Sequence, residues 1–254
     1  MKASAIEFRL RMWIITAIVV FGFWAPWLVF FEPSTGAFDP ARRIATLEWL
    51  ALEISRLGLV SFTVATPIVI VLGALAAAIG AVLRVWGAAY LGYNVVHHGQ
   101  MQGGAVMAAG PYGYMRNPLY LGGWFMMAAI SLLMPPSGAL FTMVLMTIHF
   151  LRLILGEEAF LAAQLGEPYA EYLRAAPRLL PRLRAGLPAS AAQPQWLAAV
   201  LAEVTAIGIF VALAFLSWTY NNELMVKAIL VSFGISLVVR GFVKGKANSG
   251  NSAA

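Results

Sequence analysis

The sequence predicts an all-α, polytopic membrane protein with about six transmembrane helices, and two observations support this fold class. The chain of 254 residues is 61% hydrophobic and only 11% charged, whereas a soluble domain carries about 25% charged residues. Long runs without any charge also recur along the chain. Such runs suit helices of about 20 residues, which cross a hydrocarbon core about 30 Å thick. An integral membrane protein is therefore expected.

Residues 1–82 are expected to hold two spans and a helix on the membrane surface. Met12 to Phe31 carries no charge, is long for a signal peptide and has no cleavage site after it, which predicts an uncleaved first span. A second uncharged run, Leu57 to Leu83, predicts a span that ends at Arg84 and continues or bends beyond it. Between the two spans, one helical face is apolar, which favours an interfacial helix; this face contains Ile44, Leu47, Leu50, Ala51, Ile54 and Leu57.

Residues 83–184 contain two polar segments separated by a predicted hairpin. In the first segment, Gly110 to Gly123, Gly and Pro residues set backbone angles that a continuing helix cannot use. The next helix is therefore expected to begin at Pro118. An uncharged run follows and is divided at Pro135 into two short spans of about 17 residues each. Their antiparallel hairpin returns the second polar segment, Gly156 to Pro181, to the side of the first.

Residues 195–254 predict a two-span extension with a polar, disordered tail. The spans are Trp196 to Tyr220, which contains Glu203, and Leu224 to Val239. With six spans, thirteen of the 17 lysines and arginines fall on one side of the membrane. The positive-inside rule then puts both termini and both polar segments in the cytoplasm, and we expect the plasma (inner) membrane of a bacterium or archaeon.

Several site classes are excluded or disfavoured by composition. The absence of cysteine excludes disulfides, thiolate catalysis and Cys-ligated metals. The net charge of +6 is explained by membrane orientation, so no nucleic-acid partner is expected. His97 and His98 are adjacent, and neighbouring side chains on a helix do not face each other. No cysteine or nearby carboxylate completes a ligand set, so no metal site is predicted.

The two polar segments together resemble a known family. The sequence "GPYGYMRNPLYLGG", then an apolar hairpin, then "EEAFLAAQLGEPYAEYL" and "PRLLP" look like the membrane methyltransferases of isoprenylcysteine carboxylates and phospholipid amines. The preceding "LRVWGAAYLG" also fits, so the resemblance covers Leu83 to Pro181. The carboxylate branch usually has His at the position of Asn117, so this asparagine is closer to the amine branch. By contrast, "YAEYLRAAPRLLP" is similar to the carboxylate branch. The lipid head group therefore stays open between a carboxylate and an amine.

The resemblance implies S-adenosylmethionine as the methyl donor, a lipid or lipidated substrate, and a site that opens to the cytoplasm. Arg116 would orient a substrate carboxylate, Glu158 or Tyr120 would accept a proton from an amine, and Asn117 would orient a group or fix the turn. Donor binding is implied for residues of both segments, namely Gly110, Pro111, Tyr112, Tyr114, Pro118, Gly122, Glu157, Glu158, Tyr169, Tyr172 and Arg178.

Alternatives remain for single residues and for the whole chain. Glu157 and Glu158 fit solvated carboxylates at a helix start, and Arg116 fits an anchor that snorkels to lipid phosphates. The chain as a whole fits a membrane reductase that uses NADPH, or a non-enzymatic transporter or assembly factor. For the last class only Glu203 offers a charge within a span. The oligomeric state is left open by the sequence.

Overall fold

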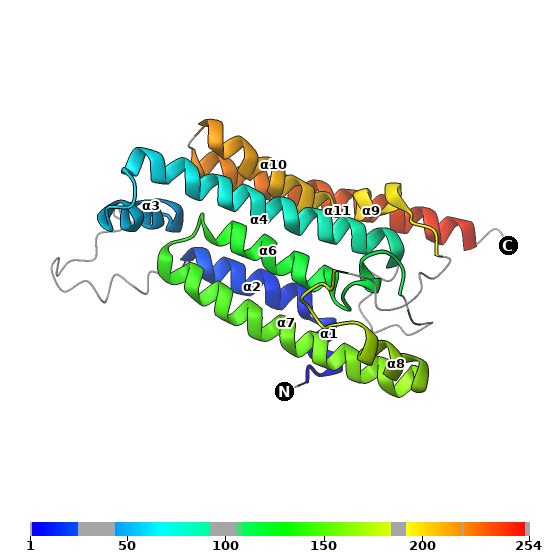
Figure 1. Ribbon diagram of the computed structural model, residues 1–254. Helices are drawn as coiled ribbons and strands as arrows, with labels where there is room; N and C mark the ends of the chain where they lie inside the picture. Colours follow the sequence, from blue (N-terminus) through cyan, green and yellow to red (C-terminus); the bar gives the residue numbers. More distant parts are fainter. Residues whose placement is uncertain are drawn as a thin grey trace.

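The computed structural model describes residues 2–24, 44–91, 106, 108–183, 192–219 and 221–251. In these ranges all regular structure is helical (Figure 1), which confirms the predicted all-α class. The elements in chain order are α1 (Ala5–Arg9), α2 (Arg11–Trp24), α3 (Thr46–Arg56), α4 (Phe62–Leu91), the 3₁₀-helix η3 (Gly110–Gly113), α6 (Pro118–Ser131), α7 (Pro136–Leu165), α8 (Glu167–Ala175), α9 (Trp196–Ala202), α10 (Val204–Thr219) and α11 (Asn222–Asn251).

Helix α4 lies in the middle of an elongated bundle. Figure 1 shows α6, α2 and α7 on one side of it and α10 and α11 on the other. Small residues allow α4 and α6 to approach closely, because a Cβ atom at Gly80 would lie only 2.8 Å from the carbonyl oxygen of Gly122. Close backbone contact of this kind is the usual basis of helix packing in membranes. The core on either side of α4 includes Ala77, Met126 and Leu213, all fully or almost fully buried.

The expected six spans are not confirmed. In the described part of the chain, α4 and α7 are long and apolar enough to cross a membrane, and the bent pair α9–α10 makes up to three. Helices α2 and α6 have 14 residues each, and at 1.5 Å per residue they cover about 21 Å, less than the hydrocarbon thickness. The end of the expected first span, from residue 25 to Phe31, lies outside the described residues.

Three expectations about helix lengths are wrong. The hairpin is not made of two equal halves, because α7 has 30 residues and runs on through Glu157 and Glu158 to Leu165. The expected fifth span is broken at Glu203, where α9 and α10 meet at a 68° bend. The tail expected to be disordered is helical as far as Asn251. By contrast, the helix predicted near residues 44–57 is present as α3, with Leu47 and Ala51 buried, and its location on the membrane surface stays a prediction.

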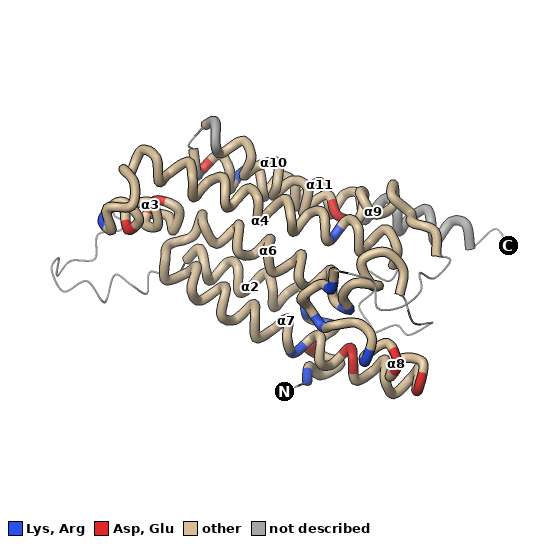
Figure 2. Tube along the Cα trace, viewed as in Figure 1, with Lys and Arg blue, Asp and Glu red and all other residues tan. Residues whose placement is uncertain are grey.

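Charged residues are concentrated at the ends of the bundle. Figure 2 shows that the middle of the described helices carries almost none of them. The N-terminal segment lies at the same end as α8, because the Ala3 backbone N–H donates to the Arg152 carbonyl at 3.0 Å. Glu7 of α1 accepts two hydrogen bonds from the Arg152 guanidinium, at 2.7 and 2.9 Å. This end of the bundle also holds η3, the start of α6 and the last turns of α7.

Candidate active site

The first polar segment folds as a tight turn followed directly by α6. Gly110 has φ +57°, and a Cβ atom there would clash with the ring of Tyr90, so both backbone angle and space require glycine. The turn closes as η3, with the Met115 N–H donating to the Pro111 carbonyl at 3.0 Å. Pro118 is the first residue of α6, as predicted from its fixed φ and missing N–H.

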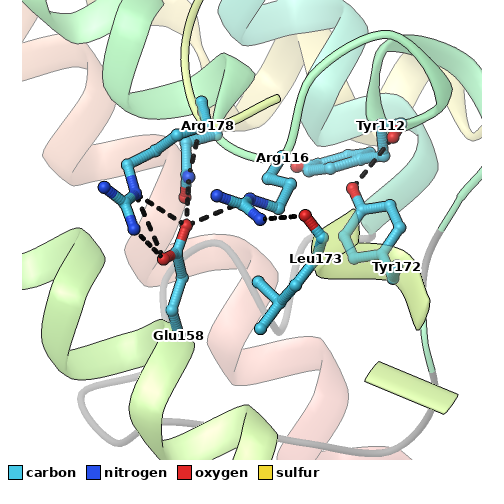
Figure 3. Close-up of polar contacts among 7 residues, drawn as sticks. Tyr112, Arg116, Glu158, Tyr172, Leu173 and Arg178 are labelled. Carbon is cyan, nitrogen blue, oxygen red and sulfur yellow. Dashed lines mark hydrogen bonds and ion pairs between the residues drawn. The ribbon is translucent and has the colours of Figure 1, made fainter. Parts of the chain in front are cut away.

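A single carboxylate connects the two polar segments. Glu158, on α7 and almost buried, forms an ion pair with Arg178 at 2.9 Å and with Arg116 at 3.2 Å. Figure 3 shows its carboxylate between the two guanidinium groups, with Arg116 also donating to the Leu173 carbonyl at 2.8 Å. The hydrogen bond from Arg178 to Glu158 raises the pKa of the Arg178 side chain. We call Glu158, Arg116, Arg178 and Asn117 the Glu158 cluster.

Asn117 belongs to this cluster because its amide reaches both polar segments. Its Nδ2 donates to Glu158 Oε1 at 3.3 Å and to the Arg178 carbonyl at 3.1 Å. The side chain is buried and makes no helix-capping hydrogen bond. An amide that bridges a carboxylate and a carbonyl positions both groups and cannot exchange a proton itself.

A second carboxylate, Glu157, faces the start of α6. Its Oε2 accepts a hydrogen bond from the Tyr120 hydroxyl at 3.0 Å. The Tyr120 ring packs edge-on against Phe150, with the ring centroids 5.7 Å apart. The two consecutive acidic residues therefore have different partners: Glu157 has a tyrosine and Glu158 has two arginines and an amide.

Three tyrosines line the side of the turn near α8. The Tyr172 hydroxyl donates to the Tyr112 carbonyl at 2.8 Å, and the Tyr169 and Tyr172 rings lie 5.8 Å apart. Burial raises the pKa of Tyr169 to about 12, and it also raises the pKa values of Tyr112 and Tyr172. The Tyr112 hydroxyl is buried and has no hydrogen-bond partner among the residues that the structure describes. Gly166, with φ +62°, joins α7 to α8 and sets the direction in which Tyr169 and Tyr172 are presented.

The structure brings most of the expected site residues together. Glu157, Glu158, Arg116, Asn117, Tyr120 and Arg178 are connected by the contacts above, and Tyr112, Tyr169 and Tyr172 lie beside them. Gly110, Pro111 and Pro118 shape the turn. Tyr114 instead lies against Trp86, with ring centroids 6.1 Å apart, and Gly122 faces α4, where a Cβ atom would lie 2.8 Å from Arg84 Cγ.

Both alternatives for single residues are wrong. Glu157 and Glu158 are not solvated carboxylates at a helix start, because they lie in the last third of α7 and Glu158 is 7% exposed. Arg116 does not snorkel, because its side chain is 10% exposed and points to Glu158. His97 and His98 lie outside the described residues. Among the described residues no group of three His, Asp or Glu side chains could hold a metal, and the absence of a metal site stays a prediction.

One ion pair at this end of the bundle was missed by sequence reasoning. Arg84 of α4 donates to both carboxylate oxygens of Glu203, at 2.6 and 2.8 Å. Glu203 is buried at the break between α9 and α10, and Arg84 Nη1 also lies 3.4 Å from the Leu119 carbonyl. The available signal was that each of these residues is a lone charge in an apolar run.

The comparisons with known proteins point to one family. No curated protein and no solved structure matches the chain significantly. A profile of the phospholipid methyltransferase family matches residues 68–168, the segment that includes α6, α7 and both candidate carboxylates. The match indicates a membrane methyltransferase that acts on lipid. The resemblance predicted from the motifs is thus confirmed, since residues 68–168 match the phospholipid methyltransferase family.

Proposed function

We propose that this chain transfers a methyl group from S-adenosylmethionine to a lipid or lipidated substrate at the Glu158 cluster. The family match supports lipid methylation in a membrane. The observation that carries the proposal further is the carboxylate of Glu158 in contact with two arginines, next to the Glu157–Tyr120 pair. Residues 83–184 are the proposed methyltransferase core, and with the six spans expected from the sequence, the excess of basic residues on one side supports a cytoplasmic site and cytoplasmic termini.

The chemistry of the cluster fits this donor. The amino-acid part of S-adenosylmethionine carries an ammonium and a carboxylate, and Glu158 and Arg116, 3.2 Å apart, are the complementary pair. Arg178 is 44% exposed, so it can move into water and leave Glu158 to the ligand. The Tyr112 hydroxyl, which has no partner within the described part of the chain, offers a further hydrogen bond in a buried setting, where leaving a hydrogen bond unmade is costly. The bound donor supplies an electrophilic methyl group.

Besides binding the donor, the site must orient the lipid head group and, for an amine substrate, accept one proton. Positioning alone contributes about 7–11 kcal/mol to such reactions. An amine substrate must lose a proton, and the Tyr120 hydroxyl, hydrogen-bonded to Glu157, is the group placed to pass it to a carboxylate. Glu158 is less suited to that role, since three neighbouring side chains already hold it. A carboxylate substrate needs no base, only a cation such as Arg116 to orient it.

Binding measurements on the purified protein in detergent test the donor assignment. We expect calorimetry to detect S-adenosylhomocysteine binding to the native protein and to detect no NADPH binding. Combined Glu157→Gln and Glu158→Gln substitutions should abolish the binding of S-adenosylhomocysteine, because they remove the Glu158 carboxylate that complements the ligand's ammonium and the neighbouring carboxylate that could replace it. Glu167→Gln is the matched control, since Glu167 forms an exposed ion pair with Arg174 on α8.

Two outcomes would contradict the donor assignment: unchanged S-adenosylhomocysteine affinity in the double variant, and NADPH binding in place of it. Incubation of membranes with labelled donor, followed by lipid extraction, then identifies the head group. Label that resists mild base indicates a methylated amine, and label released as methanol indicates a methyl ester.

A further inference from the structure

Residues Pro177–Leu183, which we call the strap, follow α8 and lie across the first polar segment. The backbone N–H of Arg116 donates to the Pro177 carbonyl at 2.9 Å, and the backbone N–H of Arg182 donates to the Tyr114 carbonyl at 3.1 Å. Asn117 Nδ2 adds a hydrogen bond to the Arg178 carbonyl between these two points, at 3.1 Å. The strap is therefore held at both ends, with its course fixed by the turn beneath it.

The strap exposes two large apolar side chains next to two arginines. Leu180 is 80% exposed and Leu183 is fully exposed, while Arg182 is exposed and Arg178 is about half exposed. The strap contains no acidic residue. Leucines paired with basic side chains in this way are typical of segments that lie in the head-group region of a bilayer.

The depth of the strap agrees with that location. Helix α7 begins at Pro136, so Glu158 lies about 33 Å further along its axis at 1.5 Å per residue. A bilayer with one hydrocarbon edge at Pro136 has its other edge about 30 Å away, close to Glu158. Because Arg178 of the strap pairs directly with Glu158, this bilayer position would put the strap at the level of the lipid head groups.

We propose that the strap is a binding surface for anionic phospholipid head groups. Leu180 and Leu183 insert beside the acyl-chain boundary. The Arg182 guanidinium donates to the Ala175 carbonyl through Nη1, and its other N–H groups bind phosphate oxygens, which suit its planar donors. The same strap carries Arg178, so the lipid surface supports one side of the Glu158 cluster. This inference concerns the strap and does not depend on which methyl donor or lipid substrate the chain uses.

A fluorescent probe on the strap tests the proposal. The native chain has no cysteine, so Leu180→Cys gives a single attachment site for a polarity-sensitive fluorophore. The labelled protein is placed in nanodiscs of phosphatidylcholine alone or of phosphatidylcholine mixed with phosphatidylglycerol, each containing a lipid-borne quencher. We expect quenching about twofold stronger in the anionic nanodiscs, since basic residues are attracted to that surface.

The charge of Arg182 is tested in the same system. Arg182→Gln, combined with Leu180→Cys, should remove the difference between the two lipid compositions. Arg174→Gln is the matched control: Arg174 is also exposed but pairs with Glu167 on α8, and the difference should persist. Quenching that is absent in both bilayers, equal in both, or unchanged by Arg182→Gln overturns the proposal. The melting temperature of each variant verifies that it is folded.

Discussion

The Glu158 cluster and the Arg84–Glu203 pair both place a carboxylate against arginine at the same end of the bundle. They differ in charge balance and exposure. Glu158 faces two arginines, one of which is 44% exposed, whereas Glu203 faces Arg84 alone and its side chain is 3% exposed. A cluster with an extra, partly exposed cation can exchange that partner for a ligand. A balanced, buried pair is suited to holding helices together.

The location of the two regions supports the same distinction. The Glu158 cluster joins α6 and α7 of the family-matched segment to the strap. The Arg84–Glu203 pair also joins that segment, through α4, to a part outside the match, the break between α9 and α10, but its carboxylate lies outside the match, whereas Glu157 and Glu158 lie within it. We therefore expect substitutions in the first region to affect function and those in the second to affect stability.

The largest expected effect is on stability, from Glu203→Gln. The substitution leaves the Arg84 guanidinium without its carboxylate in a largely buried position, and breaking such pairs costs about 3–5 kcal/mol. Since Arg84 is 27% exposed, we expect a loss near the lower end, about 3 kcal/mol, measured by denaturation in mixed micelles.

Replacing the whole pair sharpens this prediction. Arg84→Met combined with Glu203→Leu removes both charges and should recover most of the lost stability, as apolar replacements of buried ion pairs often do. If the double variant is as unstable as Glu203→Gln alone, the pair does not act through charge compensation.

An intermediate effect, on turnover rather than stability, is expected for Arg116→Lys. Lysine keeps the charge next to Glu158 but loses the planar fork that can hold a carboxylate. Methyl transfer to the lipid should fall about tenfold, which corresponds to about 1.4 kcal/mol of transition-state stabilisation. The melting temperature should hardly change, and full activity in this variant would reduce Arg116 to a structural ion-pair partner.

The smallest effect is expected for Glu223→Gln on α11. Glu223 pairs with Lys227 at 2.7 Å, but both side chains are largely exposed, and exposed pairs of this kind contribute little. Neither melting temperature nor methyl transfer should change measurably. A clear destabilisation here would show that exposed ion pairs contribute to the stability of this chain. The stability loss expected for Glu203→Gln could then not be attributed to burial of the Arg84–Glu203 pair.

Local features of the site were predictable from sequence because they depend on backbone chemistry. Gly110 and Pro118 specify a turn and a helix start, and both occur as expected. The hairpin was predictable from Pro135, which interrupts an uncharged run. The hydrogen-bond partners of the side chains could not be predicted in the same way, since Asn117 reaches Glu158 and the Arg178 carbonyl only after three helices have packed.

The wrong expectations concern helices whose length differs from the length of the apolar run in the sequence. The uncharged run ends at Leu151, but α7 continues past it through Glu157 and Glu158, because a helix that leaves the bilayer has no physical reason to stop at its edge. Similarly, the apolar run around Glu203 is continuous in composition, but the helix is broken at Glu203, whose side chain pairs with Arg84. The boundaries proposed for the three parts of the chain, at residues 83, 184 and 195, stay a prediction.

Gly166 shows how conformation alone can fix the orientation of two helices. Apart from Gly166 itself and its two chain neighbours, no atom of the described residues lies within 4 Å of the position that its Cβ atom would occupy, yet its φ of +62° belongs to a region that side-chain-bearing residues rarely adopt. The joint between α7 and α8 is therefore intolerant of substitution despite being surrounded by open space. Surface accessibility would classify position 166 as freely variable. Its φ angle, however, sets the direction of α8 and therefore the positions of both buried tyrosines on that helix.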